Sequence, residues 1–147
     1  MSSDSTLKTV RFIRAAAVRG GVDRQVHASN CTAAHFLKTM AELRLDGLTH
    51  ETAEGWRPTD AGYLAMLTPA ARSTLMRWPD PSAQLPVKFN ADPKISGPIS
   101  QIARGVATGL ARWRIVTIKR VRGRQVATLT AMGLAVATEA TARANRV

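Results

Sequence analysis

The stretch from Trp113 to Ala131 reads WRIVTIKRVRGRQVATLTA, and it decides the expected fold. Its apolar residues are β-branched or bulky and lie on both sides of a glycine, which is typical of two short strands joined by a turn. The start of a helix is predicted directly after the second strand. The cations of the stretch surround Gly123 and are Lys119, Arg120, Arg122 and Arg124. The sequence therefore predicts a β-hairpin with a positively charged tip, which suits the binding of phosphate.

The positive charge of the chain is concentrated in its second half. The formal net charge of the 147 residues is +11. Residues 68–147 hold thirteen Lys or Arg against three Asp or Glu, whereas residues 1–67 hold eight against seven. Such asymmetry indicates a polyanionic partner, either nucleic acid or an acidic membrane surface, and a solubilising charge is the simpler alternative. Clustering of the cations at one hairpin favours a polyanionic partner over a solubilising charge.

Composition narrows the class of protein. Apolar residues make up 45% of the chain, which is enough for a globular core. The single cysteine, Cys31, excludes an internal disulfide and a Cys-based zinc site and fits a reducing compartment. No apolar run approaches the ~20 residues that span a bilayer, and the first residues lack a signal-peptide core. With a composition rich in Ala and Arg, we expect a bacterial cytoplasmic, nucleoid-associated protein without a membrane partner.

The first half predicts helix, short helix, longer helix, hairpin and helix, in that order. Apolar residues at helical spacing predict helices over residues 6–19 and 32–45, with Ser29 or Asn30 as the cap of the latter. A short helix starts at Asp23, and residues 49–58 read as two strands around a turn. Thr59 caps a helix to Leu67. The expected core face of the longer helix is Ala33, Phe36, Leu37, Met40 and Leu43.

The second half repeats part of this order. A helix from Pro69 to Trp78 is followed by residues 79–98, whose five prolines predict a loop or linker without regular structure. A helix over 101–113, the hairpin, and an Ala-rich helix from Thr130 complete the chain. Thr49 aligns with Thr117, and the phrase TDAG at Thr59 aligns with TAMG at Thr130, which indicates a diverged internal repeat or a chance match. The expected organisation is a first unit at 1–67, a helix and linker at 68–98, and a second, truncated unit at 99–147.

Three features of the first half resemble the winged helix-turn-helix superfamily. They are the order of elements, the phrase LRLDGL at the end of the longer helix (residues 43–48), and the phrase TDAG after the hairpin. The phrase RGRQVATLTAMG (residues 122–133) is similar to the wing and following helix of MarR-type regulators, which have one wing per chain where this sequence predicts two. The resemblance implies an α+β fold that is mainly α-helical with short β-hairpins, arranged as tandem winged helices.

The resemblance implies sequence-specific binding of double-stranded DNA by a bacterial transcriptional regulator. One helix would enter the major groove and a basic wing would reach the backbone or minor groove. For any single helix residue, a solvated polar face is the simpler alternative. The candidate contacts of the first unit are Ser29, Asn30, Thr32, His35, Lys38 and Thr39. Those of the second unit are Gln101, Arg104, Thr108 and Arg112 on the helix, and Lys119, Arg120, Arg122 and Arg124 on the wing.

Several partners and roles remain open at this point. A homodimer would pair through the Ala-rich last helix, and the acidic first wing, with Arg57 as its only cation, would suit RNA polymerase. Other readings are a phage- or plasmid-type factor in replication, excision or gene-transfer control, an adaptor that binds RNA polymerase or another protein, and RNA binding.

The sequence predicts neither a metal site nor catalysis. His27, Cys31 and His35 would form one stripe on a continuous helix, but the expected cap at Ser29 and Asn30 interrupts it and no fourth ligand is evident. No Gly-rich phosphate loop, nucleophile elbow or zinc-protease phrase occurs. We therefore expect no enzymatic activity and no cofactor.

Overall fold

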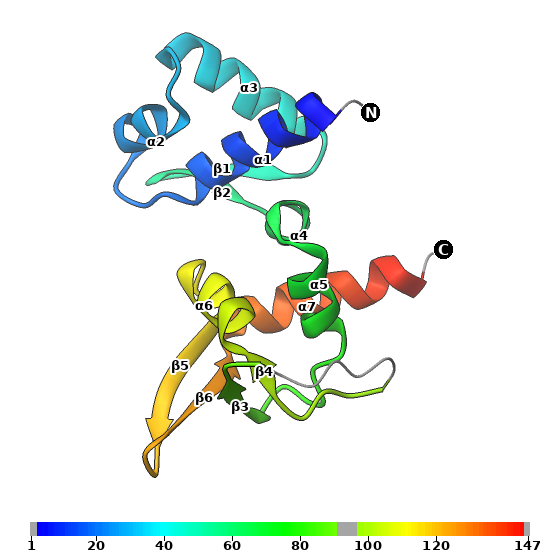
Figure 1. Ribbon diagram of the computed structural model, residues 1–147. Coiled ribbons are helices and arrows are strands. Elements are labelled where there is room, and N and C mark those ends of the chain that lie inside the picture. The colour runs from blue at the N-terminus through cyan, green and yellow to red at the C-terminus, as the bar shows by residue number, and fades with distance from the viewer. Residues whose placement is uncertain (1–2, 91–96, 146–147) are drawn as a thin grey trace. The chain divides into compact units, whose positions relative to one another are not determined.

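A computed structural model describes residues 3–90 and 97–145 of the chain. It consists of helices with two small sheets, which agrees with the expected α+β class (Figure 1). The chain divides into two units, unit 1 from Met1 to Met66 and unit 2 from Leu67 to Val147. None of the helices in the described ranges has the length and apolar character that crossing a membrane requires.

Unit 1 follows the expected order of elements. Its hairpin pairs Thr49 with Pro58 and Thr52 with Gly55. The bounds are α1 (Ser3–Ala17), α2 (Val22–Ser29), α3 (Ala33–Leu45), β1 (Thr49–Thr52), β2 (Gly55–Pro58) and α4 (Asp60–Met66).

The core of unit 1 combines apolar packing with one buried amide. Phe12 and Ile13 from α1 and Phe36 and Met40 from α3 are fully buried. Gln25 of α2 is 1% exposed, and its Nε2 donates to the Trp56 carbonyl at 2.7 Å while its Oε1 accepts from the Trp56 N–H at 2.9 Å. Because a buried amide is stable only when hydrogen-bonded, Gln25 ties α2 to the hairpin strand β2.

Unit 2 is built on a four-stranded sheet in the order β4-β3-β6-β5. Strands β5 and β6 form the predicted hairpin, with Val116 opposite Leu129 and Val121 opposite Arg124. The bounds are α5 (Pro69–Met76), β3 (Gln84–Lys88), β4 (Ile102–Ala103), α6 (Arg104–Arg112), β5 (Val116–Val121), β6 (Arg124–Leu129) and α7 (Ala131–Asn145).

Strand β3 corrects the expectation of a linker without regular structure at residues 79–98. It pairs antiparallel with β6, with Leu85 opposite Ala127, and parallel with β4, with Val87 opposite Ile102. Leu85 and Ile102 are buried. Strand β3 therefore belongs to the sheet of unit 2. The helix expected from residue 101 starts later, because residues 102–103 form β4 and α6 begins at Arg104.

The same local arrangement joins helix, hairpin and helix in both units. The Thr59 N–H donates to the Leu48 carbonyl at 3.0 Å, and the Thr130 N–H donates to the Ile115 carbonyl at 3.1 Å. Each Thr hydroxyl also accepts from the N–H of the Gly three residues later, at 3.1 Å in unit 1 and 2.9 Å in unit 2. The hydroxyl thus caps the helix that follows the hairpin.

The glycine of this arrangement is required by space. A Cβ on Gly62 would collide with the Leu48 carbonyl oxygen, and a Cβ on Gly133 would collide with the Ile115 carbonyl oxygen. The T-x-x-G phrase therefore packs the start of each helix directly on the residue that precedes the hairpin. We call this arrangement the Thr-Gly clasp.

The clasp also corrects the alignment of the two halves. Leu48 and Ile115 are equivalent, because each N–H donates to the carbonyl five residues earlier, at 2.9 and 3.0 Å. Thr49 therefore corresponds to Val116 and not to Thr117. Equivalent residues of the two units differ in residue number by 67 before the hairpin and by 71 after it. The second hairpin is therefore longer by four residues, two in each strand.

We predict that Gly133→Ala destabilises unit 2 by about 2 kcal/mol or more, because backbone must move to accommodate the methyl group. Urea unfolding followed by circular dichroism measures the change. Gly109→Ala is the matched control, since a Cβ there meets nothing within 4 Å. The control is expected to raise stability by about 0.5–1 kcal/mol. Equal stability of the two variants would contradict the clasp.

Candidate nucleic-acid interface

The outward face of α6 is polar and basic. Arg104, Thr108 and Arg112 follow one another at a spacing of four and are all exposed, while Ala107 and Leu110 on the opposite face are fully buried. The helical period therefore places the three polar side chains on one line that faces away from the core.

Two glycines lie beside this line of side chains. A Cβ added to Gly105 or Gly109 would meet no atom within 4 Å. Each glycine costs a helix interior about 0.5–1 kcal/mol relative to alanine. Since nothing inside unit 2 requires them, they leave the backbone of α6 open to close approach by another molecule.

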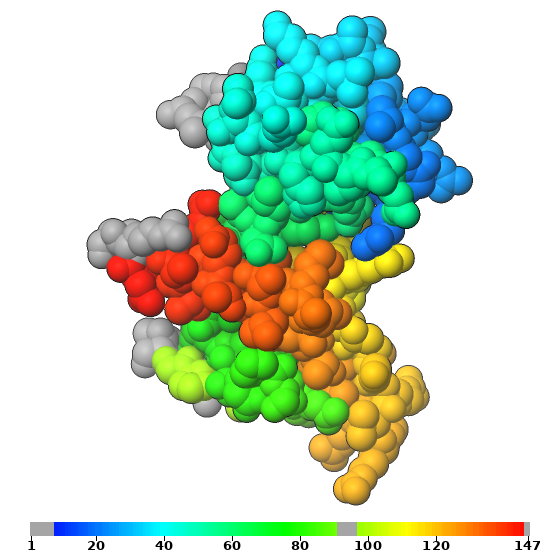
Figure 2. Space-filling view, turned by 180° about the vertical axis from the view of Figure 1, so that it is seen from behind, coloured from blue at the N-terminus to red at the C-terminus, as the bar shows by residue number. Residues whose placement is uncertain are grey.

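The hairpin β5–β6 carries exposed cations on both of its faces. Arg120 lies opposite Gln125 and Lys119 lies opposite Val126, so the two cations point to opposite faces of the ribbon. Arg122 and Gly123 form the two-residue tip. The hairpin projects from unit 2 in the space-filling view (Figure 2). Its cations are therefore accessible from more than one side.

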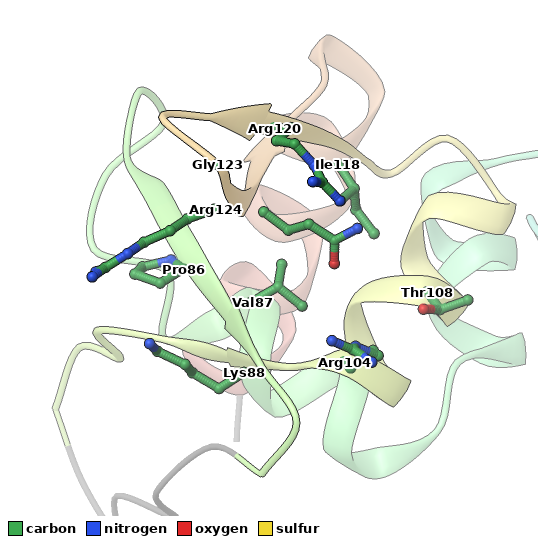
Figure 3. Close-up of a pocket in the computed structure, with 10 residues that line it drawn as sticks. Pro86, Val87, Lys88, Arg104, Thr108, Ile118, Arg120, Gly123 and Arg124 are labelled. Carbon is green, nitrogen blue, oxygen red and sulfur yellow. The ribbon is translucent and has the colours of Figure 1, made fainter.

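A groove of about 630 Å³ lies between α6, β3 and the hairpin. Arg104 and Arg120 point into the space between α6 and the hairpin, and Lys88 and Arg124 lie on the side of β3 (Figure 3). The lining residues are Pro86, Val87, Lys88, Arg104, Thr108, Ile118, Arg120, Gly123, Arg124 and Gln125. The lining thus includes four cations and no acidic residue. We call this surface the basic groove.

Among the described residues, no acidic partner is found for the cations of the basic groove. An ion pair away from the groove joins Arg143 and Glu139 at 2.9 Å, within α7. Arg112, just outside the groove, stacks its guanidinium 4.9 Å from the ring centre of Trp113. Uncompensated like charges in one cleft repel one another and create a positive potential, which an external polyanion would neutralise.

Four of the eight residues predicted for the second unit line this surface, and a fifth lies beside it. Arg104 and Thr108 line the groove beside Arg120 and Arg124, and Arg112 continues the line on α6. Gln101 does not line the groove, because it precedes β4 and is half-buried off the helix. Lys119 and Arg122 are exposed on the hairpin and do not line the groove either. Lys88 was missed, because it ends a strand that the proline-rich composition of its surroundings concealed.

In unit 1 the prediction for Ser29 is wrong. Ser29 is the last residue of α2 and fully buried, and its hydroxyl donates to the Val26 carbonyl at 2.6 Å. The cap of α3 is Thr32, whose Oγ1 accepts from the His35 N–H at 3.2 Å, and Asn30 ends α2 in a left-handed conformation. Ser29 therefore has no surface to offer a ligand.

The remaining residues predicted for unit 1 surround an apolar face. Asn30, Thr32, His35 and Lys38 are exposed and Thr39 is half-buried. The residues of α3 equivalent to Arg104, Thr108 and Arg112 are Leu37, Ala41 and Leu45. Leu37 is 45% exposed, so its expected place in the core is wrong. The face of α3 that matches the basic face of α6 is thus uncharged along its centre.

The hairpin of unit 1 also differs from that of unit 2. The guanidinium of its only cation, Arg57, donates through Nη1 to the Ala17 carbonyl and through Nη2 to the Tyr63 hydroxyl, each at 2.9 Å. Glu51 and Glu54 are exposed. The first hairpin therefore offers acids to solvent and uses its cation internally.

The stripe of His27, Cys31 and His35 is divided between two helices. His27 lies in α2 and His35 in α3, with Cys31 between them as a free thiol. Among the described residues, no three His, Cys, Asp or Glu side chains are grouped closely enough to hold a metal ion.

Comparison with known proteins gave no match to a family model, a curated protein or a solved structure.

The tip of the second hairpin yields a stability prediction. Arg122 and Gly123 have φ values of 52° and 78°, the left-handed region that two-residue hairpin turns favour and that Asn-Gly occupies most readily. We expect Arg122→Asn to leave unit 2 as stable or up to about 1 kcal/mol more stable, because Asn accepts this conformation better than Arg.

Arg120→Asn is the control for this substitution, since Arg120 lies within β5 and has an ordinary strand conformation. Asn is disfavoured in strands, so this variant should be less stable than the parent. Thermal unfolding of both variants measures the difference. Destabilisation by Arg122→Asn equal to that by Arg120→Asn would contradict the turn assignment.

Proposed function

We propose that the protein binds double-stranded DNA through unit 2 and acts as a sequence-specific transcriptional regulator of the bacterial type, without catalysis. The observation that carries the proposal is the basic groove, which gathers Lys88, Arg104, Arg120 and Arg124 from three separate parts of the fold, with no acidic partner among the described residues. Such clustering destabilises the isolated protein and is offset when a polyanion binds.

We further propose that both units are winged helices. The clasped order of helix, hairpin and helix in each unit supports this assignment. In unit 2, α5 takes the place of the first helix, α6 that of the recognition helix and β5–β6 that of the wing. The second helix of the motif is replaced by β3 and the chain that leads to β4, so unit 2 is a reduced form of the fold.

The major groove is the best match for α6. Its polar line from Arg104 to Arg112 spans eight residues, or about 12 Å at 1.5 Å per residue, close to the width of the major groove of B-DNA. Arg side chains pair with guanine, and a Thr methyl packs on thymine. Gly105 and Gly109 would let the helix backbone approach the base edges closely.

The hairpin and β3 would hold the phosphates. Arg120 and Arg124 from the hairpin and Lys88 from β3 border the same groove as Arg104. Phosphate contacts of this kind fix the position of the protein on the duplex, and base contacts from α6 supply the specificity. Duplex RNA fits less well, because the deep and narrow major groove of its A-form helix does not admit a side-chain-bearing helix.

An adaptor role for unit 1 is the second candidate. It is favoured by the internal use of Arg57 and by the apolar centre of the α3 face, neither of which suits a phosphate backbone. In this case unit 2 would hold DNA and unit 1 would contact a protein, RNA polymerase among the possibilities. A phage- or plasmid-type role in replication, excision or gene-transfer control would use the same DNA surface.

We predict that Arg122→Asn combined with Arg124→Gln lowers affinity for duplex DNA by about tenfold or more at low salt, because two phosphate contacts are lost. Fluorescence anisotropy of a labelled duplex over a salt series measures the effect. If about five cations contact phosphate, the log–log slope of the parent is about −4 to −5, and the variant should lose about 2 of it.

The matched control for this loss of charge is Lys8→Gln combined with Arg14→Gln, which removes two exposed cations from α1 in unit 1. The control should keep the slope of the parent. If both double variants bind alike, the hairpin does not contact DNA and the attraction is due to net charge alone.

Sequence specificity is tested through the face of α6. Bound genomic fragments are first selected and sequenced to find the preferred site. Arg104→Ala and Arg112→Ala should each relax the preference at one position, at a cost of about 1–3 kcal/mol for a base contact. If random duplex competes as well as the selected site with the parent protein, sequence-specific regulation is rejected in favour of an architectural role.

A further inference from the structure

The outward face of α3 carries large apolar side chains that unit 1 does not use. Leu45 is 87% exposed and Leu37 is 45% exposed, and Ala34 and Ala41 lie on the same face at helical spacing. The core of unit 1 takes different residues from α3, namely Phe36, Met40 and Leu43. The outward stripe of Ala34, Leu37, Ala41 and Leu45 is therefore not part of the packing of the unit.

The stripe stands where unit 2 has its proposed base-reading residues. Leu37, Ala41 and Leu45 are equivalent to Arg104, Thr108 and Arg112. Leucines offer DNA neither charge nor hydrogen bonds, and a contiguous exposed apolar patch is characteristic of a protein interface. The stripe of unit 1 thus suits a protein partner, at the position that carries the proposed DNA contacts in unit 2.

We propose that this stripe binds the same stripe of a second copy of the chain, with the two α3 helices antiparallel and a twofold axis at Ala41. This arrangement places Leu37 of one copy opposite Leu45 of the other, on both sides of the axis. The small Ala41 at the centre lets the helices approach closely. The contact is isologous, as in most homodimers.

Charge favours a second copy as the occupant. Lys38 and Glu42 lie one turn apart on the same flank of the stripe, and both are exposed. In the antiparallel pair, Lys38 of one copy lies beside Glu42 of the other, and symmetry repeats the contact. In a parallel pair related by a twofold axis, the flanks that carry Lys38 lie on opposite sides of the contact, so Lys38 and Glu42 do not meet across it. The flank is therefore self-complementary in the antiparallel orientation only.

The dimer is expected to be modest in strength. Helix α3 has 13 residues and is about 20 Å long, so the contact is small for a protein interface. Each assembly would carry two copies of the basic groove, which suits a DNA site with two half-sites. The association itself does not depend on DNA and is measured without it, so its failure is distinct from failure of the proposed function.

Sedimentation velocity over a range of micromolar concentrations tests the association. The parent chain should show a concentration-dependent monomer–dimer equilibrium, and Leu45→Arg should raise the dissociation constant by about tenfold or more, because the contact would bury an unpaired charge. Leu45 is almost fully exposed, so this change does not touch the core. A parent chain that stays monomeric at every concentration overturns the proposal.

Leu134→Arg is the matched control, since Leu134 is 41% exposed on α7, the helix whose Ala-rich sequence was expected to pair. This variant should dimerise as the parent does. If Leu134→Arg dissociates the dimer and Leu45→Arg does not, the interface lies on α7 and the proposal is wrong.

Disulfide trapping tests the position of the twofold axis. In a Cys31→Ser background, Ala41→Cys should give a covalent dimer on mild oxidation, because the two Cys side chains meet at the axis. Ala34→Cys should not, because the two copies of this residue would be about 21 Å apart along the helices. Equal cross-linking of the two variants excludes the antiparallel register.

Exchange of the charges at Lys38 and Glu42 tests whether these residues meet across the dimer. Lys38→Glu should weaken the dimer at low salt, because it places acids side by side, and Lys38→Glu combined with Glu42→Lys should restore it. Circular dichroism verifies that the variants are folded. A double variant no stronger than Lys38→Glu alone shows that these residues do not meet across the dimer.

Discussion

The Thr-Gly clasp is the contact on which the geometry of each unit depends. One carbonyl, that of Leu48 or Ile115, accepts the N–H of the Thr that caps the following helix, while the glycine of that helix lies against it without a side chain. The helix that follows the hairpin is thereby fixed to the residue that precedes it, and the two strands between them are held at their base. The hairpin is also joined to α6, because the Ile115 N–H donates to the Leu110 carbonyl near the end of that helix. A surface shared by the two elements, such as the basic groove, is therefore preorganised.

The two units share the Thr-Gly clasp but differ in the chemistry of their surfaces. Arg104 and Arg112 on α6 correspond to Leu37 and Leu45 on α3, and a long basic hairpin corresponds to a short one whose cation, Arg57, is bonded internally. None of these side chains belongs to a core, so either set is compatible with the fold. Surface chemistry is thus decoupled from architecture here, and two recognition tasks can be divided between two copies of one scaffold.

The sequence was informative where a local rule dominates. The hairpin of unit 2 was predicted with its charges, because β-branched strands and an Arg-Gly tip are short-range signals. Strand β3 was missed because its stability comes from pairing with β6, which is distant in sequence, and only Leu85 and Val87 mark it within a proline-rich stretch. Ser29 was misplaced because three neighbouring residues, Ser29, Asn30 and Thr32, have side chains that can cap a helix, and tertiary packing selected Thr32. Leu37 was assigned to the core because periodicity alone does not distinguish two apolar faces of one helix.

The two glycines of α6 have a consequence for the dynamics of the proposed DNA surface. A nine-residue helix that contains Gly105 and Gly109 has little tendency to persist alone, and its order depends on the burial of Ala107 and Leu110. Its amide protons should therefore exchange through local opening at lower free energy than the global unfolding of unit 2. A ligand that holds this helix in place gives up part of its interaction free energy to suppress that opening. The proposed recognition of DNA by α6 would in this sense be coupled to the completion of its own folding.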